Sequence, residues 1–341
     1  MPDNIPQTMQ ALVLHDYQEN YREVLHAEEC PVPQPGEGEV LVKMSAAPVN
    51  PSDLMFMQGQ YGFRKETPIV PGFEGAGTVV AAGDGLLPSV WNGRRVACVA
   101  TTDKNGSWAQ YMVTNATSCL PVGGEVNDEQ AATRFVDPLT AVALLERARE
   151  LGARAVVSTA AASQVGRMVL RLANSRAVPA IHIVRRQEQV EMLREMGGRY
   201  VLNSSDDDFD AQLHDLTREL KATVLFDAVA GELTGRVLHQ MPSGSTAIVY
   251  GALAMAAIQM HPADLIFKNK RMEGFWLSAP QKSLNPLSLA RLLAAGRGVL
   301  GGDATTRTDI RGTYSLADAP DAIAAYEGEM SAGKVLIKPW A

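Results

Sequence analysis

The 341-residue sequence is poor in cysteine and aromatic residues and carries no excess of positive charge. Its three cysteines, Cys30, Cys98 and Cys119, are odd in number and lie in no Cys-x-x-Cys spacing. This argues against a disulfide framework or a structural zinc lobe. A formal net charge of −7 argues against nucleic-acid binding, which needs a basic face. No apolar run reaches the roughly eighteen residues that a membrane-spanning helix requires.

A targeting pattern is also missing from the first residues. MPDNIPQTMQ has neither a basic start followed by an apolar core nor an Arg- and Ser-rich amphipathic pattern. Together with the scattered cysteines, this predicts a cytoplasmic protein with reduced thiols and no membrane partner. The composition is 46% hydrophobic and 20% charged, and the length exceeds that of one ordinary core. We therefore expect a globular protein of two domains.

Metal-ligand spacing is absent as well. The six histidines are dispersed, with no helical or hairpin spacing that would bring two of them onto one ion: His15, His26, His182, His214, His239 and His261. The sequence therefore predicts no metal site.

The first third of the chain is rich in short strand patterns. Five apolar runs between residues 9 and about 130 are separated by Gly and Pro: MQALVLHD, GEVLVKMSA, GTVVAAG, RRVACVA and AQYMVT. Strands at this spacing with little helix between them predict a β-barrel-type domain. The pattern changes at Asp137-Pro138, which predicts a helix with Asp137 as N-cap and Pro138 at its first position. Gly152 then ends that helix.

Strand and helix patterns alternate after residue 152. The expected strands are 154–159, 180–184, 200–202, 223–229 and 246–252, and the expected helices are 164–175, 187–196 and 207–220. This alternation predicts a doubly wound α/β domain, a parallel sheet with helices on both faces. After residue 280 we expect one helix over 286–295 and a return strand over 334–339.

The first strand-helix turn of the α/β region is a candidate dinucleotide site. It reads Ala161-Ala162-Ser163-Gln164-Val165-Gly166, in which only the last glycine of a G-x-G-x-x-G pattern is present. Small side chains still let a pyrophosphate approach the helix N-terminus, and Ser163 offers a hydroxyl. A turn that only packs tightly is the alternative. The candidate contacts are Ala162, Ser163, Gln164 and Val165.

The end of the next strand bears on the choice of cofactor. Arg185 and Arg186 follow the strand AIHIV at the position where an acidic residue would favour NAD. A guanidinium matches the 2′-phosphate of NADPH bidentately, so the pair favours NADPH. The alternative is an exposed basic loop.

The run NPSDLMFMQGQYG at residues 50–62, with the turn Gly72-Phe73-Glu74-Gly75, resembles the active-site segment of zinc-independent medium-chain dehydrogenases/reductases. Within that superfamily it is most similar to the 2-enoyl thioester reductases and the NADPH:quinone reductase-like proteins. The resemblance extends from Met9 to Lys338. It implies a GroES-like β-barrel-type catalytic domain over residues 1–133, a Rossmann domain over 134–278 and a C-terminal return over 279–341.

The same resemblance implies further contacts to NADPH. These are Thr140 and the segments Tyr250-Gly251-Ala252-Leu253 and Phe275-Trp276-Leu277, together with Lys334 in SAGKVLIK. NADP-specific members carry an arginine where Arg185 and Arg186 stand. Asp137 is also a candidate contact to NADPH. It departs from the family, whose enoyl reductases have Asn there, and a role as N-cap is the structural alternative that is sufficient to explain it. Gly72-Phe73-Glu74 replaces the Gly-His-Glu turn of the zinc branch, so the resemblance also implies no metal.

Tyr61 is the candidate catalytic residue. It matches the tyrosine that the enoyl reductases use as proton donor, in a Gly-flanked loop whose side chain can face a cleft between domains. Hydride addition to the β-carbon of a conjugated carbonyl compound leaves a proton to be delivered to the α-carbon. Tyrosine, with a pKa of about 10, is protonated at neutral pH and can deliver it. Packing of Tyr61 in its loop, or over the cofactor, is the alternative.

The sequence thus predicts an NADPH-dependent reductase of activated carbon-carbon double bonds, acting on a small-molecule enoyl thioester or enone. An NADPH:quinone oxidoreductase and a non-catalytic NADPH-binding sensor or scaffold remain as alternatives. Edge strands of such sheets often pair across a dimer axis, so a homodimer is expected. An acyl-carrier-protein partner would imply a basic patch, for which Arg64 and Lys65 are the candidates, but ordinary solvated charge is the interpretation favoured for this pair.

Overall fold

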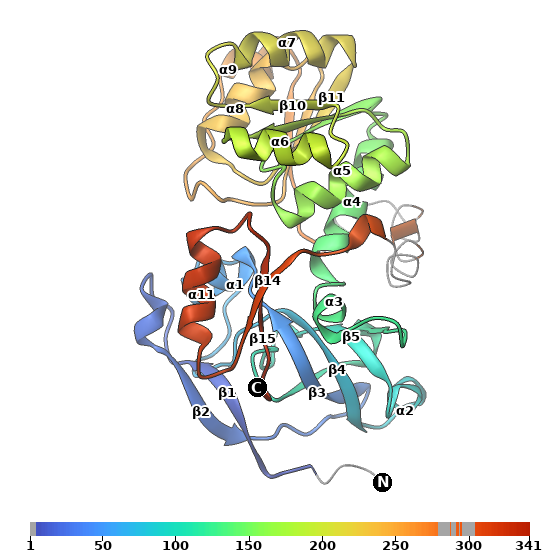
Figure 1. The fold of residues 1–341 in the computed structure, drawn as a ribbon, viewed down its shortest axis with the longest axis vertical. Helices are drawn as coiled ribbons and strands as arrows, with labels where there is room; N and C mark the ends of the chain where they lie inside the picture. Colours follow the sequence, from blue (N-terminus) through green and yellow to red (C-terminus); the bar gives the residue numbers. More distant parts are fainter. Residues whose placement is uncertain (1–4, 279–286, 288–290, 293, 295–303) are drawn as a thin grey trace. The chain divides into compact units, whose positions relative to one another are not determined.

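The computed structural model describes residues 5–278, 287, 291–292, 294 and 304–341 (Figure 1). The chain divides into two compact units, and the first gives way to the second between Val136 and Asp137. The first unit takes up the chain again from Arg307 to the C-terminus. The domain boundaries expected after residues 133 and 278 stay predictions. The helix expected over 286–295 lies largely outside the described residues.

The first unit is mainly antiparallel β-structure. Its strands are β1 (Thr8–Leu14), β2 (Leu25–Pro31), β3 (Glu39–Pro48), β4 (Glu74–Ala82), β5 (Arg95–Val99), β6 (Tyr111–Asn115), β7 (Cys119–Pro121), β14 (Ile310–Tyr314) and β15 (Lys334–Ile337). Its helices are α1 (Pro51–Met57), α2 (Leu86–Trp91), α3 (Asp128–Ala132) and α11 (Ala319–Gly328), with short 3-10 turns η1 (Tyr21–Glu23) and η2 (Ala116–Ser118). The five strand patterns expected before residue 130 are confirmed as β1, β3, β4, β5 and β6.

The C-terminal segment completes this unit. The strand β15 pairs with β3 through Leu336 opposite Pro48 and Ile337 opposite Ala47, and β14 pairs parallel to β15. Figure 1 shows α11 beside these two strands. The return expected over 334–339 is confirmed. As a result, a lysine near the end of the chain is built into the same sheet as the N-terminal strands.

The second unit holds one parallel sheet. Its strands are β8 (Ala155–Ser158), β9 (Ala180–Val184), β10 (Tyr200–Asn203), β11 (Ala222–Asp227), β12 (Thr246–Val249) and β13 (Arg271–Gly274). Its helices are α4 (Val136–Glu150), α5 (Gln164–Ser175), α6 (Gln187–Glu195), α7 (Phe209–Glu219), α8 (Gly231–Gln240) and α9 (Pro262–Ile266), with the 3-10 turn η4 (Ala304–Thr306). The strand order β10-β9-β8-β11-β12-β13 is that of a Rossmann fold, with its switch point between β8 and β11.

Alternating side chains bury both faces of this sheet. On β9, Ile181 and Ile183 join the apolar cluster that contains side chains of α7 and α8. Val184 joins a separate cluster that contains side chains of α5 and α6. Helices therefore cover both faces, as the near-continuous apolar strands of the sequence require. The predicted doubly wound domain is confirmed.

One local expectation is wrong. Helix α4 begins at Val136, so Asp137 is a residue of its first turn and not its N-cap. A carboxylate in the first turn still complements the positive end of the helix dipole, which accounts for the acidic residue before Pro138. Gly152, at φ +71°, follows the helix as expected.

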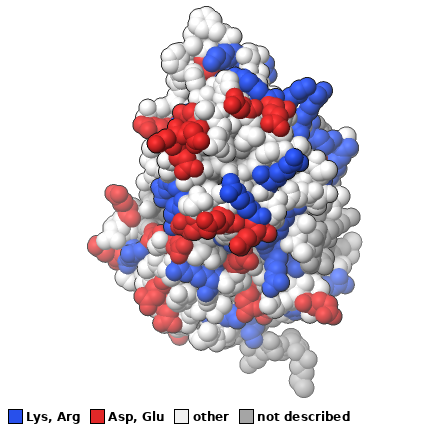
Figure 2. Space-filling model, turned by 45° about the horizontal axis from the view of Figure 1, so that its top comes forward, with Lys and Arg blue, Asp and Glu red and all other residues white. Residues whose placement is uncertain are grey.

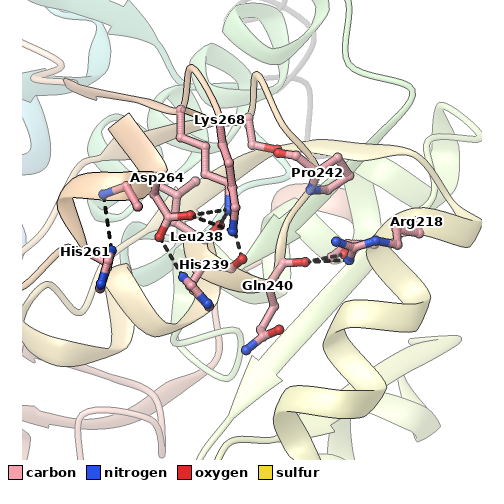
Figure 3. Close-up of polar contacts among 12 residues, drawn as sticks. Arg218, Leu238, His239, Gln240, Pro242, His261, Asp264 and Lys268 are labelled. Atoms are coloured by element: carbon pink, nitrogen blue, oxygen red, sulfur yellow. Dashed lines mark hydrogen bonds and ion pairs between the residues drawn. The ribbon is translucent and has the colours of Figure 1, made fainter. Parts of the chain in front are cut away.

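A buried carboxylate anchors the edge strand β13 (Figure 3). Asp264 in α9 accepts hydrogen bonds from His239 Nδ1 at 2.7 Å and Lys270 Nζ at 3.0 Å, and Lys268 Nζ lies 3.2 Å away. Lys270 also donates to the carbonyl oxygen of Leu238, at the end of α8. Burial would raise the pKa of Asp264, but the three donors outweigh it and lower the pKa to about 2. The cluster ties α8 and α9 to the start of β13.

Candidate active site and cofactor-binding edge

Tyr61 follows a helix end of defined geometry. Helix α1 starts at Pro51 with Asn50 as N-cap and ends in Gly59 at φ +70°. The Gly59 N–H donates to Phe56 O and the Gln60 N–H to Met55 O, both at 2.9 Å. These two bonds form a Schellman motif, which stops the helix and fixes the direction of the chain. Tyr61 is therefore the first residue after a fixed turn.

The Tyr61 ring is set in an aromatic cluster. It lies 4.8 Å from the Phe73 ring and 5.3 Å from the Phe63 ring, between centroids. The Arg64 guanidinium closes the loop, because its Nε and Nη2 both donate to Gly59 O, at 3.1 and 2.9 Å. The loop that presents Tyr61 is thus braced from both sides.

Lys65 is not part of a basic patch. Its ammonium donates to the carbonyl oxygens of Thr101, at 2.9 Å, and Lys104. Burial lowers the pKa of Lys65 to about 8. Lys65 is therefore neither an ordinary solvated charge nor part of an exposed basic surface with Arg64, because its ammonium holds the loop at Thr101 and Lys104.

A buried polar network lies behind this loop. The four side chains of Asn50, Asp53, Glu74 and Lys334 are at most 2% exposed. Lys334 Nζ donates to Asn50 Oδ1, and Asn50 Nδ2 donates to Glu74 Oε1 at 3.1 Å. The network brings the end of the chain to the N-terminus of α1 and the start of β4.

Asp53 and Glu74 also fix the backbone around them. Asp53 accepts from the N–H groups of Asn50, at 2.8 Å, and Phe73, at 3.0 Å. Glu74 Oε2 accepts from the Val136 N–H at 2.8 Å, at the last residue of the first unit. Burial, and secondarily the Glu74 charge, raise the pKa of Asp53 to about 7, although its two N–H donors and Lys334 act in the opposite direction. The run at residues 50–62 contains Asn50 and Asp53, but nothing in their spacing indicated this network.

In the second unit, the turn after β8 has the form of a dinucleotide turn without its usual glycines. Ala160 takes φ +45°, the conformation that glycine usually supplies. Ser163 is the N-cap of α5, and its Oγ accepts from the Gly166 N–H at 3.2 Å. A Cβ on Gly166 would meet Ala161 O at 2.5 Å, so only glycine fits at this close approach of helix to strand. Ala162 and Gln164 are buried and Val165 is half-buried.

The two arginines lie at the end of the adjacent strand β9. Arg185 is exposed, and within the described residues its guanidinium makes no hydrogen bond or ion pair. Arg186 is half-exposed, and its Nε lies 3.0 Å from Glu188 Oε1. Because β8 and β9 are parallel neighbours, their ends lie on the same edge of the sheet. This edge fits a phosphorylated dinucleotide: a helix N-terminus, a glycine at close approach and a free guanidinium one strand away.

A second structured loop follows β11 on this edge. Asp227 is fully buried and accepts from Thr159 Oγ1 at 2.7 Å and Thr234 Oγ1 at 2.5 Å. It also accepts from the N–H groups of Val229 and Ala230. The sequence suggested none of these contacts, because single Thr and Asp residues carry no recognisable spacing.

Tyr250 continues the edge after β12. Its hydroxyl is buried without a hydrogen-bond partner among the described residues. Burial, Asp227 and Asp137 together raise the pKa of the Tyr250 hydroxyl well above its usual range. A Cβ on Gly251 would meet Ala228 O at 2.8 Å. The predicted residues Asp137 and Tyr250 are thus brought close enough to interact.

The other predicted contacts have mixed exposure. Thr140 and Phe275 are buried, Ala252 and Leu277 are half-buried, and Leu253 and Trp276 are exposed. The Phe275 N–H donates to Val249 O at 2.8 Å, which continues the pairing of β13 with β12. Lys334 belongs to the first unit and its ammonium lies on Asn50. As cofactor contacts, all of these remain predictions.

The described part of the chain contains no group of three or more His, Cys, Asp or Glu side chains arranged to hold a metal ion. None of its helices is long and apolar enough to cross a membrane. Figure 2 shows acidic and basic side chains interspersed over the face in view.

Comparison with known families matches both units. Residues 36–124 match the model of the alcohol dehydrogenase GroES-like domain, and residues 164–293 match the model described as zinc-binding dehydrogenase. A crystal structure from Mesorhizobium loti, provisionally assigned as an NADPH:quinone reductase, is 34% identical. It superimposes with a TM-score of 0.90, over 98% of this chain and 100% of the other. The chain belongs to the medium-chain dehydrogenase/reductase superfamily.

Relatives within the superfamily include both enoyl and quinone reductases. The mitochondrial enoyl-[acyl-carrier-protein] reductase of Arabidopsis thaliana is 32% identical over 252 residues, which are 71% of this chain and 65% of that protein. A mycobacterial protein solved in complex with NADPH is 26% identical, with a TM-score of 0.79 over 97% of this chain and 100% of the other. The expected superfamily, fold class and oxidoreductase activity are confirmed, and so is NADPH as the cofactor of the homologous family.

Proposed function

We propose that this chain is an NADPH-dependent reductase of activated carbon-carbon double bonds, acting on α,β-unsaturated carbonyl compounds such as 2-enoyl thioesters. Bound NADPH would supply a hydride for the β-carbon of the substrate. Tyr61 would donate the phenolic proton to the α-carbon and then regain a proton from water, so the double bond gains one hydride and one proton.

The placement of Tyr61 is the observation that carries this proposal. The Schellman motif at Gly59 and the hydrogen bonds from Arg64 to Gly59 O fix the loop. The tilted contact with the Phe73 ring orients the Tyr61 ring. A proton donor must be held within hydrogen-bond reach of one atom, and a braced loop meets that need. If Tyr61 only packed in its loop, the loop would not need both the Schellman motif and the Arg64 hydrogen bonds.

Two groups of residues would bind NADPH. Ala162 to Val165 at the start of α5 would receive the pyrophosphate, because a helix N-terminus favours negative charge. Arg185 and Arg186 would take the 2′-phosphate. Further proposed contacts are Asp137, Thr140, Tyr250, Gly251, Ala252, Leu253, Phe275, Trp276, Leu277 and Lys334.

Parallel assays of two substrate classes test the proposed reaction. We expect the purified protein to oxidise NADPH with a trans-2-enoyl thioester at a kcat/KM at least about tenfold higher than with a 1,4-quinone. The product thioester should carry deuterium at its α-carbon when the reaction runs in D2O. Quinone turnover alone would assign the chain to the quinone reductases, and binding of NADPH without either turnover would favour a sensor or scaffold.

We further propose a homodimer formed through β13, with the chain in the cytoplasm. The strand β13 is an edge of the described sheet, and exposed apolar residues precede it in the sequence: Ile266 is 69% exposed and Phe267 81% exposed. Edge strands present unpaired backbone groups that can pair with another copy. The three cysteines are free thiols, in keeping with a reducing compartment.

Light scattering after size exclusion checks the dimer. We expect twice the chain mass for the wild type and a shift towards the monomer for Met272→Lys, which places a charge on the exposed face of β13. Leu86→Lys is the matched control, because Leu86 is an exposed apolar residue on α2 of the other unit. A dimer that survives Met272→Lys unchanged would rule out β13 as the contact.

A further inference from the structure

Asp53 is connected to Tyr61 through one intervening residue. Its Oδ1 accepts a hydrogen bond from the Phe73 N–H at 3.0 Å, and the Tyr61 ring packs at a tilt against the Phe73 ring, with the ring centroids 4.8 Å apart. Phe73 lies in the tight turn Gly72-Phe73-Glu74. The backbone of this turn is held by the Ser107 N–H, which donates to Gly72 O at 3.0 Å, and by the Ala100 N–H, which donates to Phe73 O at 2.8 Å. The hydrogen bond from the Phe73 N–H to Asp53 adds a further contact that positions Phe73.

The charge around Asp53 is unbalanced. Two carboxyl groups, Asp53 and Glu74, face one ammonium, Lys334, and all three are at most 2% exposed. Cys98 also faces Glu74, but burial raises the pKa of this thiol well above its usual value, so it stays neutral. With both carboxyls ionised the charges of these three side chains sum to one negative charge, and with one carboxyl protonated they sum to zero. Within this group, the Glu74 charge raises the pKa of Asp53 and the Lys334 charge lowers it. A buried group of this kind gains or loses a proton near neutral pH.

We propose that Asp53 is a positioning residue for Tyr61, and that proton uptake by the buried Asp53–Glu74 pair loosens Phe73 and with it the Tyr61 ring. The inference rests on the proposed function of Tyr61 as proton donor. The ionised carboxylate accepts both backbone N–H groups as charge-assisted bonds, which are about twice as strong as neutral ones. Protonation weakens the bond to Phe73, so the position of Tyr61 depends on pH.

The direction of the pH effect follows from the raised pKa of Asp53. Since that pKa is about 7, Asp53 is protonated at pH 6 and ionised at pH 8. We expect kcat to rise on the order of tenfold between these values, because small displacements of a reacting group carry costs of this size. The KM for NADPH should change less than kcat, because the proposed pyrophosphate and 2′-phosphate contacts lie in the second unit and, of the proposed contacts, Lys334 belongs to the network around Asp53.

Two variants and one control test the connection. Asp53→Asn removes the titrating group, and we expect a low kcat with no rise between pH 6 and 8. Glu74→Gln removes the neighbouring charge that raises the pKa of Asp53, so the rise of kcat with pH should move to lower pH. This second variant tests the connection even if Asp53→Asn does not fold. Glu39→Gln is the matched control: Glu39 is 8% exposed in the same unit and paired with Lys104. It should keep both kcat and its pH profile.

A readout independent of turnover separates this inference from the proposed function. With ring-13C-labelled tyrosine, the NMR signal that disappears in Tyr61→Phe belongs to Tyr61. In the wild type we expect the chemical shift of this signal to change with a midpoint near pH 7. This change should be absent in Asp53→Asn, and its midpoint should move to lower pH in Glu74→Gln. A flat Tyr61 titration in an active enzyme would overturn the positioning role alone. A clear step in a protein that reduces no enoyl thioester would overturn the proposed function and leave the connection intact.

Discussion

Replacing Tyr61 with Phe is expected to lower kcat for enoyl thioester reduction by about 100-fold or more, the range that a general acid contributes. Phe keeps the ring that packs edge-on against Phe63 and at a tilt against Phe73, so the aromatic contacts of the loop are retained and the O–H is lost. The KM for the thioester should change little. Steady-state NADPH oxidation measures the loss, and the thermal unfolding midpoint verifies that the variant is folded.

The matched control is Tyr17→Phe. Tyr17 belongs to the same aromatic cluster, 5.4 Å from the Phe56 ring, and its hydroxyl donates to Lys65 O. This variant also loses one phenolic O–H, the one that donates to Lys65 O. We expect its kcat to stay within about threefold of the wild type, since the two neutral hydrogen bonds that the hydroxyl makes with the Lys65 backbone contribute about 1 kcal/mol each to the stability of this loop and do not reach the proposed reaction site. Equal activity of Tyr61→Phe and the wild type would reduce Tyr61 to a packing residue.

Strands and helices with strong periodicity were predictable from the sequence. The helix Gln164–Ser175 and the strand Ala180–Val184 are found at the expected residues, because an apolar face and small flanking turns decide both locally. Elements without such patterns were missed. The strand β13, Arg271–Gly274, has only one large apolar side chain, and it exists because the β12 backbone pairs with it.

The polar networks were beyond the sequence for a different reason. Lys334 and Asn50 are 284 positions apart, and only the pairing of β15 with β3 brings them together. Likewise, Thr159 and Asp227 meet because β8 and β11 are neighbours at the switch point of the sheet. Spacing rules apply to residues within one helix or hairpin. Contacts between residues of strands that are distant in the sequence therefore produce no recognisable spacing. Tyr61 could be singled out only through the motif around it.

The Arg185→Ala/Arg186→Ala double variant is expected to raise the KM for NADPH by about 10- to 100-fold and to leave the KM for NADH within about threefold. Losing charge-assisted bonds to a phosphate costs about 1.5–3 kcal/mol, which corresponds to that range. NADH has no 2′-phosphate, so it loses nothing. Parallel saturation curves with the two cofactors measure the change in preference.

The controls test whether local geometry or general charge is responsible. Arg194→Ala removes one positive charge from the exposed last turn of α6, the helix that follows the two arginines. This variant should leave both KM values unchanged. Equal losses for NADPH and NADH in the double variant would mean that the arginines support the fold of the loop rather than read the phosphate. The single variants should also differ. Arg186 must first give up its exposed pair with Glu188, worth at most about 1 kcal/mol, whereas Arg185 has no such partner to give up, so Arg185→Ala should account for the larger share.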